Sequence, residues 1–94
     1  MLFVALLKTR PASTFQEGGT RRLAWEYPEG VNVLAEYWLE TYSPGVVSVI
    51  EADSVAPFGA LRMDWGDLFA IELVPAVTAE QGIEMLRHAM TQQG

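Results

Sequence analysis

The chain has 94 residues, half of them hydrophobic and 19% charged, which is the composition of a folded domain and excludes a disordered segment. Twelve acidic and six basic residues give a net charge of −6, which disfavours nucleic acids and anionic membranes as partners because both present phosphate groups. The chain contains no cysteine, so disulfides, thiolate metal sites and thiol catalysis are excluded. We expect one domain over residues 1–94. We also expect a cytoplasmic location, because the apolar start MLFVALLKT lacks the basic region of a signal peptide, and its apolar run stops at Lys8, too soon for a signal or membrane-spanning helix.

The first predicted elements are a strand and a helix. Residues 2–9, LFVALLKT, form a continuous apolar run of strand length, which is typical of a central strand covered on both faces. A helix is predicted from Thr14 to about Tyr27, because Thr14 and Glu17 have capping-box spacing and Pro28 follows. Its buried stripe would consist of residues at steps of four, namely Phe15, Gly19, Leu23 and Tyr27.

Two glycines, Gly18 and Gly19, lie inside this predicted helix, and each costs about 1 kcal/mol relative to alanine. They indicate close packing of the helix on the sheet, or a helix that begins later. The functional alternative is a flexible lid over a pocket.

The next predicted elements are two strands, over residues 31–41 and 46–52. They are joined by Ser43-Pro44-Gly45-Val46, which has the proline and glycine positions of a type II turn. This turn predicts a strand register with the opposed pairs Leu39 and Ile50, Trp38 and Glu51, and Glu36 and Asp53.

The last part of the chain predicts a helix, a strand and a helix. The first helix opens near Asp53 or Ser54 and ends before Gly66, with the buried stripe Phe58, Leu61 and Trp65. A strand over residues 68–74 follows and is closed by Pro75. Thr78 and Gln81 form a second capping box, which starts a helix predicted to bury Ala79, Ile83, Leu86 and Met90.

This order, β-α-β-β-α-β plus a C-terminal helix, predicts an α+β protein of the ferredoxin-like class. Right-handed crossovers place both central helices on one face of a four-stranded antiparallel sheet. That face would collect Val33, Ala35, Tyr37, Leu39, Ser48 and Ile50.

The opposite face of the sheet is predicted to be apolar as well, with embedded glutamates. It would hold Leu34, Trp38, Val47, Val49, Leu68 and Val74, together with Glu36, Glu51 and Glu72. Monomers rarely expose an apolar patch of that size. We therefore predict a homodimer in which two such sheet faces pack together into a dimeric α/β barrel.

The stretches MLFVALLK, YPEGVNVLAEYWLE, SVIEAD and DLFAIELVPAVT resemble a family of short, mostly bacterial proteins of unknown function in the dimeric α/β barrel superfamily. The resemblance extends to about residue 80, and it implies the dimeric α/β barrel fold. The superfamily includes cofactor-independent quinol monooxygenases, haem-degrading monooxygenases, muconolactone isomerases and stress-responsive barrels. The fold alone does not indicate which of these activities a member has. Haem-degrading relatives use a histidine on a barrel helix, whereas the single histidine here, His88, is predicted on the solvent face of the last helix.

The candidate site combines carboxylates with large rings, at Glu36, Trp38, Glu51, Trp65 and Glu72. A carboxylate enclosed in an apolar cavity has a raised pKa and can act as a general acid or base, while the tryptophans can stack on a planar ligand. Alternatively, the glutamates reach the rim of the barrel, or pair with Arg10, Arg62 or an arginine of a second copy, and only fix the dimer register. No cofactor or metal is predicted. The alternative is a hard-cation site formed by Glu36, Glu51 and Asp53, but carboxylates without a histidine or a motif of ligand spacing are weak evidence for it.

The sequence thus predicts a homodimer of unknown function that binds a small apolar or aromatic molecule. The alternative is a small cofactor-independent enzyme, similar to a monooxygenase or isomerase, in which Glu36 or Glu51 is the acid–base group.

Overall fold

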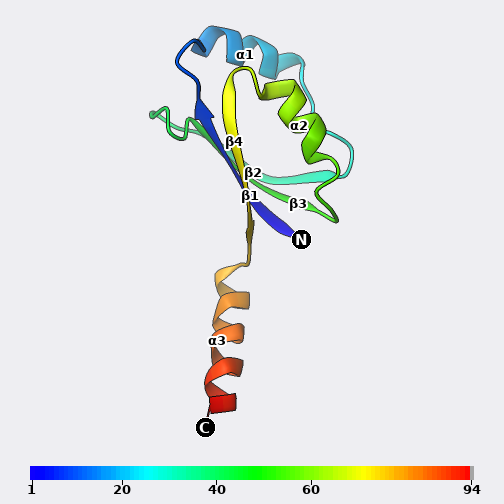
Figure 1. Ribbon diagram of the computed structural model, residues 1–94, viewed down its shortest axis with the longest axis vertical. Helices are drawn as coiled ribbons and strands as arrows, with labels where there is room; N and C mark the ends of the chain where they lie inside the picture. The colour runs from blue at the N-terminus through cyan, green and yellow to red at the C-terminus, as the bar shows by residue number, and fades with distance from the viewer. Residues whose placement is uncertain (94) are drawn as a thin grey trace.

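The computed structural model describes residues 1–93 and contains the predicted order of elements. Strands β1 (Leu2–Thr9), β2 (Val31–Trp38), β3 (Val46–Ala52) and β4 (Phe69–Ala76) form one antiparallel sheet in the order β2-β3-β1-β4. Helices α1 (Phe15–Ala24) and α2 (Phe58–Trp65) lie on one face, and α3 (Ala79–Gln93) extends beyond the end of the sheet (Figure 1). The ferredoxin-like α+β class is confirmed. Within residues 1–93 no helix is both long and apolar enough to span a membrane.

The core lies between the sheet and α2. Alternate residues of β1, namely Phe3, Ala5 and Leu7, are buried beneath the helices. Phe3 packs edge-on against Phe58 of α2, with ring centroids 4.9 Å apart. The predicted α2 stripe is confirmed, since its three residues are each at most 5% exposed. Leu68, which was predicted on the opposite face of the sheet, belongs to this core instead.

Helix α1 stands above the sheet and does not pack tightly on it. Thr14 caps it as predicted, because its Oγ1 accepts a hydrogen bond of 3.1 Å from the Glu17 N–H. The helix ends earlier than predicted, at Ala24, and none of its residues is buried. The predicted buried stripe is wrong, since Phe15 is 82% and Leu23 90% exposed.

A β-bulge in β2 changes which side chains face the helices. Val33 opposes Ile50, but Ala35 opposes Val49, so β2 holds one extra residue, Leu34. A slip of one residue moves all later side chains of a strand to the other face. The bulge therefore places the even-numbered residues after Leu34 beneath the helices.

The predicted hairpin register and face assignment are consequently wrong for this part of β2. Glu36 opposes Ser48 and Trp38 opposes Val46, so both side chains lie on the helix side of the sheet. Ala35 and Tyr37, which were predicted beneath the helices, lie on the other side. The strands are joined by a loop over residues 39–45, closed by a 2.8 Å bond from the Leu39 N–H to the Gly45 carbonyl, rather than by a tight turn.

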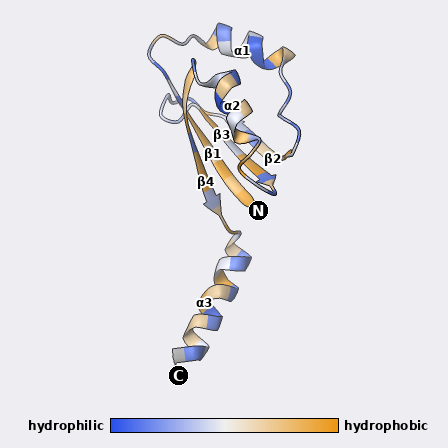
Figure 2. Cartoon of the chain, turned by 45° about the vertical axis from the view of Figure 1, so that its right-hand side comes forward, coloured by the Kyte–Doolittle hydropathy of each residue, from blue (hydrophilic) through white to orange (hydrophobic). Residues whose placement is uncertain are grey.

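The face of the sheet away from α1 and α2, here called the outer face, is not covered by any described element (Figure 2). Its members include Leu34, 51% exposed, Tyr37, 61% exposed, and Val74, 42% exposed. Val4, at the centre of this face, pairs with Val49 on one side and Val74 on the other. The outer face is therefore apolar, although its composition differs from the prediction.

Helix α3 begins at the predicted capping box, which is complete. The Gln81 N–H donates to Thr78 Oγ1 at 3.1 Å, and the Thr78 N–H donates to Gln81 Oε1 at 2.9 Å. The prediction that the apolar stripe of α3 is buried is wrong for a single chain, because Leu86 is 60% and Met90 64% exposed. The projecting helix raises the radius of gyration to 16.1 Å, whereas a compact chain of this length has about 12 Å.

Candidate ligand-binding cavity

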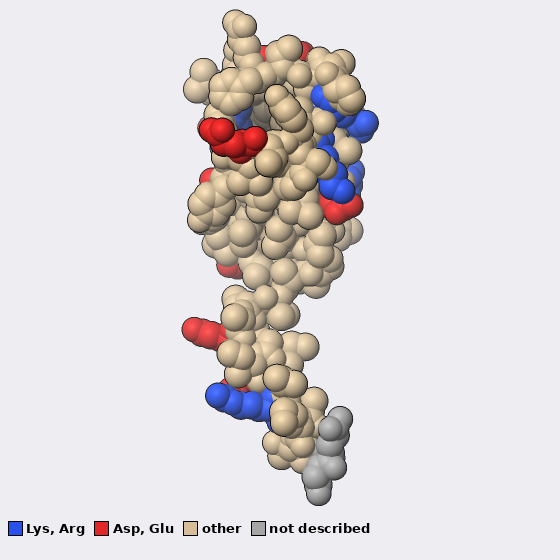
Figure 3. Space-filling model, turned by 90° about the vertical axis from the view of Figure 1, so that its left-hand side faces the viewer, with Lys and Arg blue, Asp and Glu red and all other residues tan. Residues whose placement is uncertain are grey.

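A cavity of about 170 Å³ lies between α1 and the sheet. Figure 3 shows the surface hollowed in this region. The strands β1 and β3 form its floor, α2 and the start of β4 one wall, the end of β2 another wall, and α1 its roof. The cavity exists because α1 is held above the sheet while α2 packs against it. Its lining includes Ala5, Leu7, Phe15, Gly18, Gly19, Arg22, Tyr27, Glu36, Trp38, Ser48, Leu61, Trp65 and Phe69.

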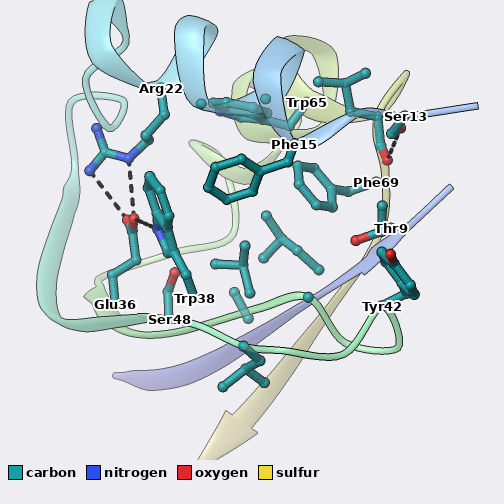
Figure 4. A pocket seen from close by; sticks show the side chains of 18 of the residues that line it. Thr9, Ser13, Phe15, Arg22, Glu36, Trp38, Tyr42, Ser48, Trp65 and Phe69 are labelled. Atoms are coloured by element: carbon teal, nitrogen blue, oxygen red, sulfur yellow. Dashed lines mark hydrogen bonds and ion pairs between the residues drawn. The ribbon is translucent and has the colours of Figure 1, made fainter.

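Aromatic rings form much of the cavity wall. Phe15 points from α1 toward Trp38 of β2 and meets it edge-on, with centroids 6.1 Å apart (Figure 4). Trp65 lies 5.5 Å from Trp25 and 5.8 Å from Phe69, measured between centroids. Such rings offer large apolar surfaces that lose little conformational entropy when a planar molecule binds.

Gly18 and Gly19 contribute the roof. A Cβ atom added at either position would meet no atom within 4 Å, although both residues line the cavity. Close packing on the sheet therefore does not explain these glycines. Their position over a cavity agrees with the lid alternative.

The polar end of the cavity is built around the Glu36 carboxylate, whose side chain is only 16% exposed. Oε1 accepts a 2.6 Å hydrogen bond from the Tyr27 hydroxyl, and Oε2 accepts one of 2.7 Å from Trp38 Nε1. The Arg22 guanidinium donates to both oxygens at 3.2 Å. Because the Tyr27 proton points to Glu36, the Ser48 hydroxyl is the donor in the 2.9 Å contact between Ser48 and Tyr27.

These contacts determine the protonation states. Burial raises the pKa of Glu36, but the hydrogen bonds from Tyr27, Trp38 and Arg22, together with the charge of Arg22, outweigh it and hold the pKa below its ordinary value. The predicted rise in the pKa of Glu36 is therefore wrong. Burial and the hydrogen bond to Glu36 raise the pKa of Tyr27 to about 12. At neutral pH the site thus contains an ionised Glu36 paired with Arg22 and a neutral phenol.

The C-terminal half of α1 is attached to the end of α2 by polar contacts. Arg21 donates to both oxygens of Asp67, at 2.7 and 2.9 Å, and to the Asp64 carbonyl at 2.9 Å. Trp25 Nε1 donates to Asp64 Oδ2 at 2.8 Å. Arg21 also pairs with Glu17 at 3.8 Å. The contact between Arg21 and Asp67 could not be predicted, because more than forty residues separate the two side chains in the sequence.

The structure brings together part of the predicted site. Glu36, Trp38 and Trp65 line the cavity. Glu51 and Glu72 lie on the outer face and are exposed, and Glu72 pairs with Lys8 at 3.2 Å.

Neither arginine named in the ion-pair alternative reaches these glutamates by a hydrogen bond within residues 1–93. Arg10 Nε donates to the Gly66 carbonyl and Arg62 Nη1 to the Ile71 carbonyl. Among the described residues no group of three or more histidine, aspartate or glutamate side chains is placed to hold a metal ion. His88 is exposed on α3, as predicted.

Three contributors to the site were missed: Arg22, Tyr27 and Ser48. Ser48 carried a signal, since it interrupts the apolar run VVSVI on a face that was expected to be buried, where a hydroxyl needs a partner. Tyr27 was predicted in the buried stripe of the first helix, and nothing in the sequence pattern connected Arg22 with Glu36.

Comparison with known proteins gives a match over residues 1–90 to one family, described as "Domain of unknown function (DUF3303)". No curated protein and no solved structure matches the chain significantly.

Proposed function

The chain belongs to the DUF3303 family, whose domain is of unknown function, and we propose that it binds a small apolar or aromatic molecule in the cavity beneath α1. The observation that carries this proposal is the cavity of about 170 Å³ with its aromatic wall. A protein cavity of about 150 Å³ with an apolar lining accommodates benzene. The size therefore favours a ligand with one ring.

The charges around the cavity favour a neutral ligand. Arg22 and Glu36 neutralise each other, and both carboxylate oxygens already accept hydrogen bonds. A charged ligand would have to separate this partly buried pair or enter an apolar space without a counter-charge, and both cost free energy. The rings of Phe15, Trp38 and Trp65 instead suit the faces and edges of an uncharged planar molecule.

The geometry favours binding over acid–base catalysis by Glu36. A general base needs a free lone pair directed at the substrate and a pKa near the working pH. The Glu36 carboxylate is ionised at neutral pH and is held by three neighbouring side chains. The enzyme alternative would require a substrate to displace one of these donors.

We also propose a homodimer formed through the outer face. Its centre consists of valines and leucines from β1 and β3, and the charged pair Lys8–Glu72 lies on β1 and β4. A second copy is the occupant that this face fits, because a two-fold axis places apolar centre against apolar centre. In sedimentation velocity at micromolar concentration the protein should be a dimer, and Val49→Glu should dissociate it. A monomeric wild type would contradict this proposal.

The ligand proposal is tested by thermal shift with neutral single-ring probes, toluene and phenol, and with benzoate as a charged control. At about ten times the dissociation constant, a neutral probe should raise the melting temperature by about 6 °C or more. Benzoate should have a smaller effect.

Two glycine-to-leucine variants locate the binding site. Gly19→Leu fills the cavity from its roof and should abolish the response to the neutral probes. Gly59→Leu is the matched control, because Gly59 also has free space around an added Cβ but does not line the cavity. An equal response in both variants would show that the probes bind elsewhere.

A further inference from the structure

The apolar stripe of α3 is unpartnered within the described chain. Ile83 is 49% exposed, Leu86 60% and Met90 64%, and the helix lies beyond the sheet in both views (Figures 1 and 2). A helix of 15 residues is marginally stable in water unless an apolar face is packed against something. The stripe therefore requires a partner that a single chain does not supply.

The spacing of the stripe is that of a two-helix seam. Ala79, Ile83, Leu86 and Met90 follow one another at steps of four, three and four, which are the a and d positions of a heptad pattern. In parallel coiled coils, isoleucine at a with leucine at d favours two helices over three or four. The flanking g positions hold small residues, Gly82 and Ala89, so no like charges meet across the seam.

We propose that α3 pairs in parallel with α3 of a second copy, in the same dimer that joins the outer faces. This inference rests on the sheet-face dimer proposed above. Helix α3 continues along the long axis of the molecule, which measures 56 × 28 × 17 Å. In the proposed dimer the two-fold axis runs along that direction, so that the two outer faces meet and the two α3 helices lie side by side.

The area of contact supports the same arrangement. Four strands about 4.8 Å apart and about 26 Å long offer roughly 500 Å² on one face. A stable interface buries roughly 800 Å² per partner, so the sheet alone falls short. A seam along α3, about 22 Å long and about 10 Å wide, adds roughly 200 Å² and brings the total close to that size.

The first test is sedimentation velocity of two full-length variants, each with one glutamate added on a different side of α3. Leu86→Glu places a carboxylate in the seam and should raise the dimer dissociation constant by about tenfold or more, because both copies carry it. His88→Glu is the matched control, since it lies on the opposite side of the same helix and should change the constant by less than about twofold. Both positions are exposed within one chain, so each variant should fold, which circular dichroism verifies.

The second test uses the absence of cysteine from the chain. Met90→Cys, at an a position, should form a disulfide-linked dimer under mild air oxidation, because a parallel seam brings the two Cα atoms within about 7 Å. His88→Cys should remain unlinked under the same conditions. An antiparallel seam would separate the two Met90 positions by more than a disulfide can span. Failure of Met90→Cys to cross-link therefore overturns parallel pairing.

The outcomes separate this inference from the sheet-face dimer. If Val49→Glu dissociates the dimer and Leu86→Glu behaves as His88→Glu does, the α3 inference is overturned and the sheet-face dimer stands. If Leu86→Glu dissociates it and Val49→Glu does not, α3 pairing stands and the sheet-face dimer fails. A monomeric wild type overturns both.

Discussion

At the scale of single residues, Glu36 connects segments that are separate in the sequence. Its carboxylate accepts hydrogen bonds from Tyr27, from Trp38 and from Arg22 at the end of α1. Charge-assisted bonds in a partly buried site are among the stronger polar interactions in proteins. Glu36 thus holds together the polar end of the cavity and fixes the position of the Arg22 side chain, which extends from α1.

The acid side of the stability profile should depend on Glu36. Its pKa is lowered in the folded state, so the unfolded chain binds more protons, and stability falls as pH drops from the ordinary glutamate pKa of about 4.3 toward the folded one. Glu36→Gln should therefore be less stable than wild type at pH 7 and lose less stability on acidification. Urea unfolding between pH 3 and pH 7 measures both. Parallel profiles for the two proteins would contradict this role.

The alkaline side should depend on Tyr27, whose pKa is raised to about 12. The protonated phenol stabilises the fold, so this contribution is complete below the ordinary tyrosine pKa of about 10 and is lost as pH rises toward 12. Tyr27→Phe should be less stable by about 1–2 kcal/mol at neutral pH and should lack this alkaline loss. Tyr42→Phe is the control, since Tyr42 is 78% exposed. Urea unfolding at pH 7 and pH 11 compares the variants.

At the scale of elements, α1 and α2 are held in place by different forces. Helix α2 buries Phe58, Leu61 and Trp65 against the sheet, whereas α1 buries no residue and depends on polar contacts at its C-terminal half. Exposed polar contacts stabilise weakly, by less than about 1 kcal/mol each. We expect α1 to open locally while the sheet and α2 stay folded.

Breaking the contact between Arg21 and Asp67 should loosen α1 selectively. In Asp67→Asn, amide hydrogen exchange over residues 15–24 should accelerate, while exchange in β1 should stay unchanged. Glu17→Gln is the control, because Glu17 lies farther from Arg21, at 3.8 Å. Equal acceleration in β1 would mean that α1 opens only when the whole chain unfolds.

The glycines of α1 should be replaceable by alanine. Gly18→Ala should raise the free energy of unfolding by about 0.5–1 kcal/mol, because the added Cβ meets no atom within 4 Å. Gly66→Ala is the contrasting variant, since its Cβ would lie 2.5 Å from the Arg62 carbonyl oxygen, and it should destabilise. Chemical denaturation of both variants measures the difference. A destabilised Gly18→Ala would show that α1 approaches the sheet more closely than the structure indicates.

At the scale of the whole molecule, α3 is separable from the rest of the chain. Its large apolar residues are exposed, so a chain that ends at Val77 should keep the near-ultraviolet circular dichroism of the tryptophans around the cavity. The same truncation should weaken dimerisation, since it removes the proposed seam. Loss of the tryptophan signal on truncation would show that α3 supports the cavity within its own chain.

Features that depend on neighbouring residues could be predicted from the amino-acid sequence alone. The order of the elements, the N-terminal caps of α1 and α3, the buried stripe of α2 and the apolar outer face followed from periodicity and capping. These features are local, because a helix cap or stripe involves residues within a few positions of one another. The predicted start of α2 near Asp53 or Ser54 is wrong, because the helix begins at Phe58 and no side chain caps it.

The composition of the site, in contrast, depends on strand register and on contacts between residues distant in the sequence. The bulge at Leu34 moved Glu36 and Trp38 beneath α1, next to Tyr27 and Ser48, and left Glu51 and Glu72 on the outer face. One unpaired residue reverses the faces of a strand, and the pattern of β2, apolar on both sides, does not reveal where that residue lies. The cavity itself exists because α1 is held by contacts to residues distant in sequence, which periodicity within the helix does not register.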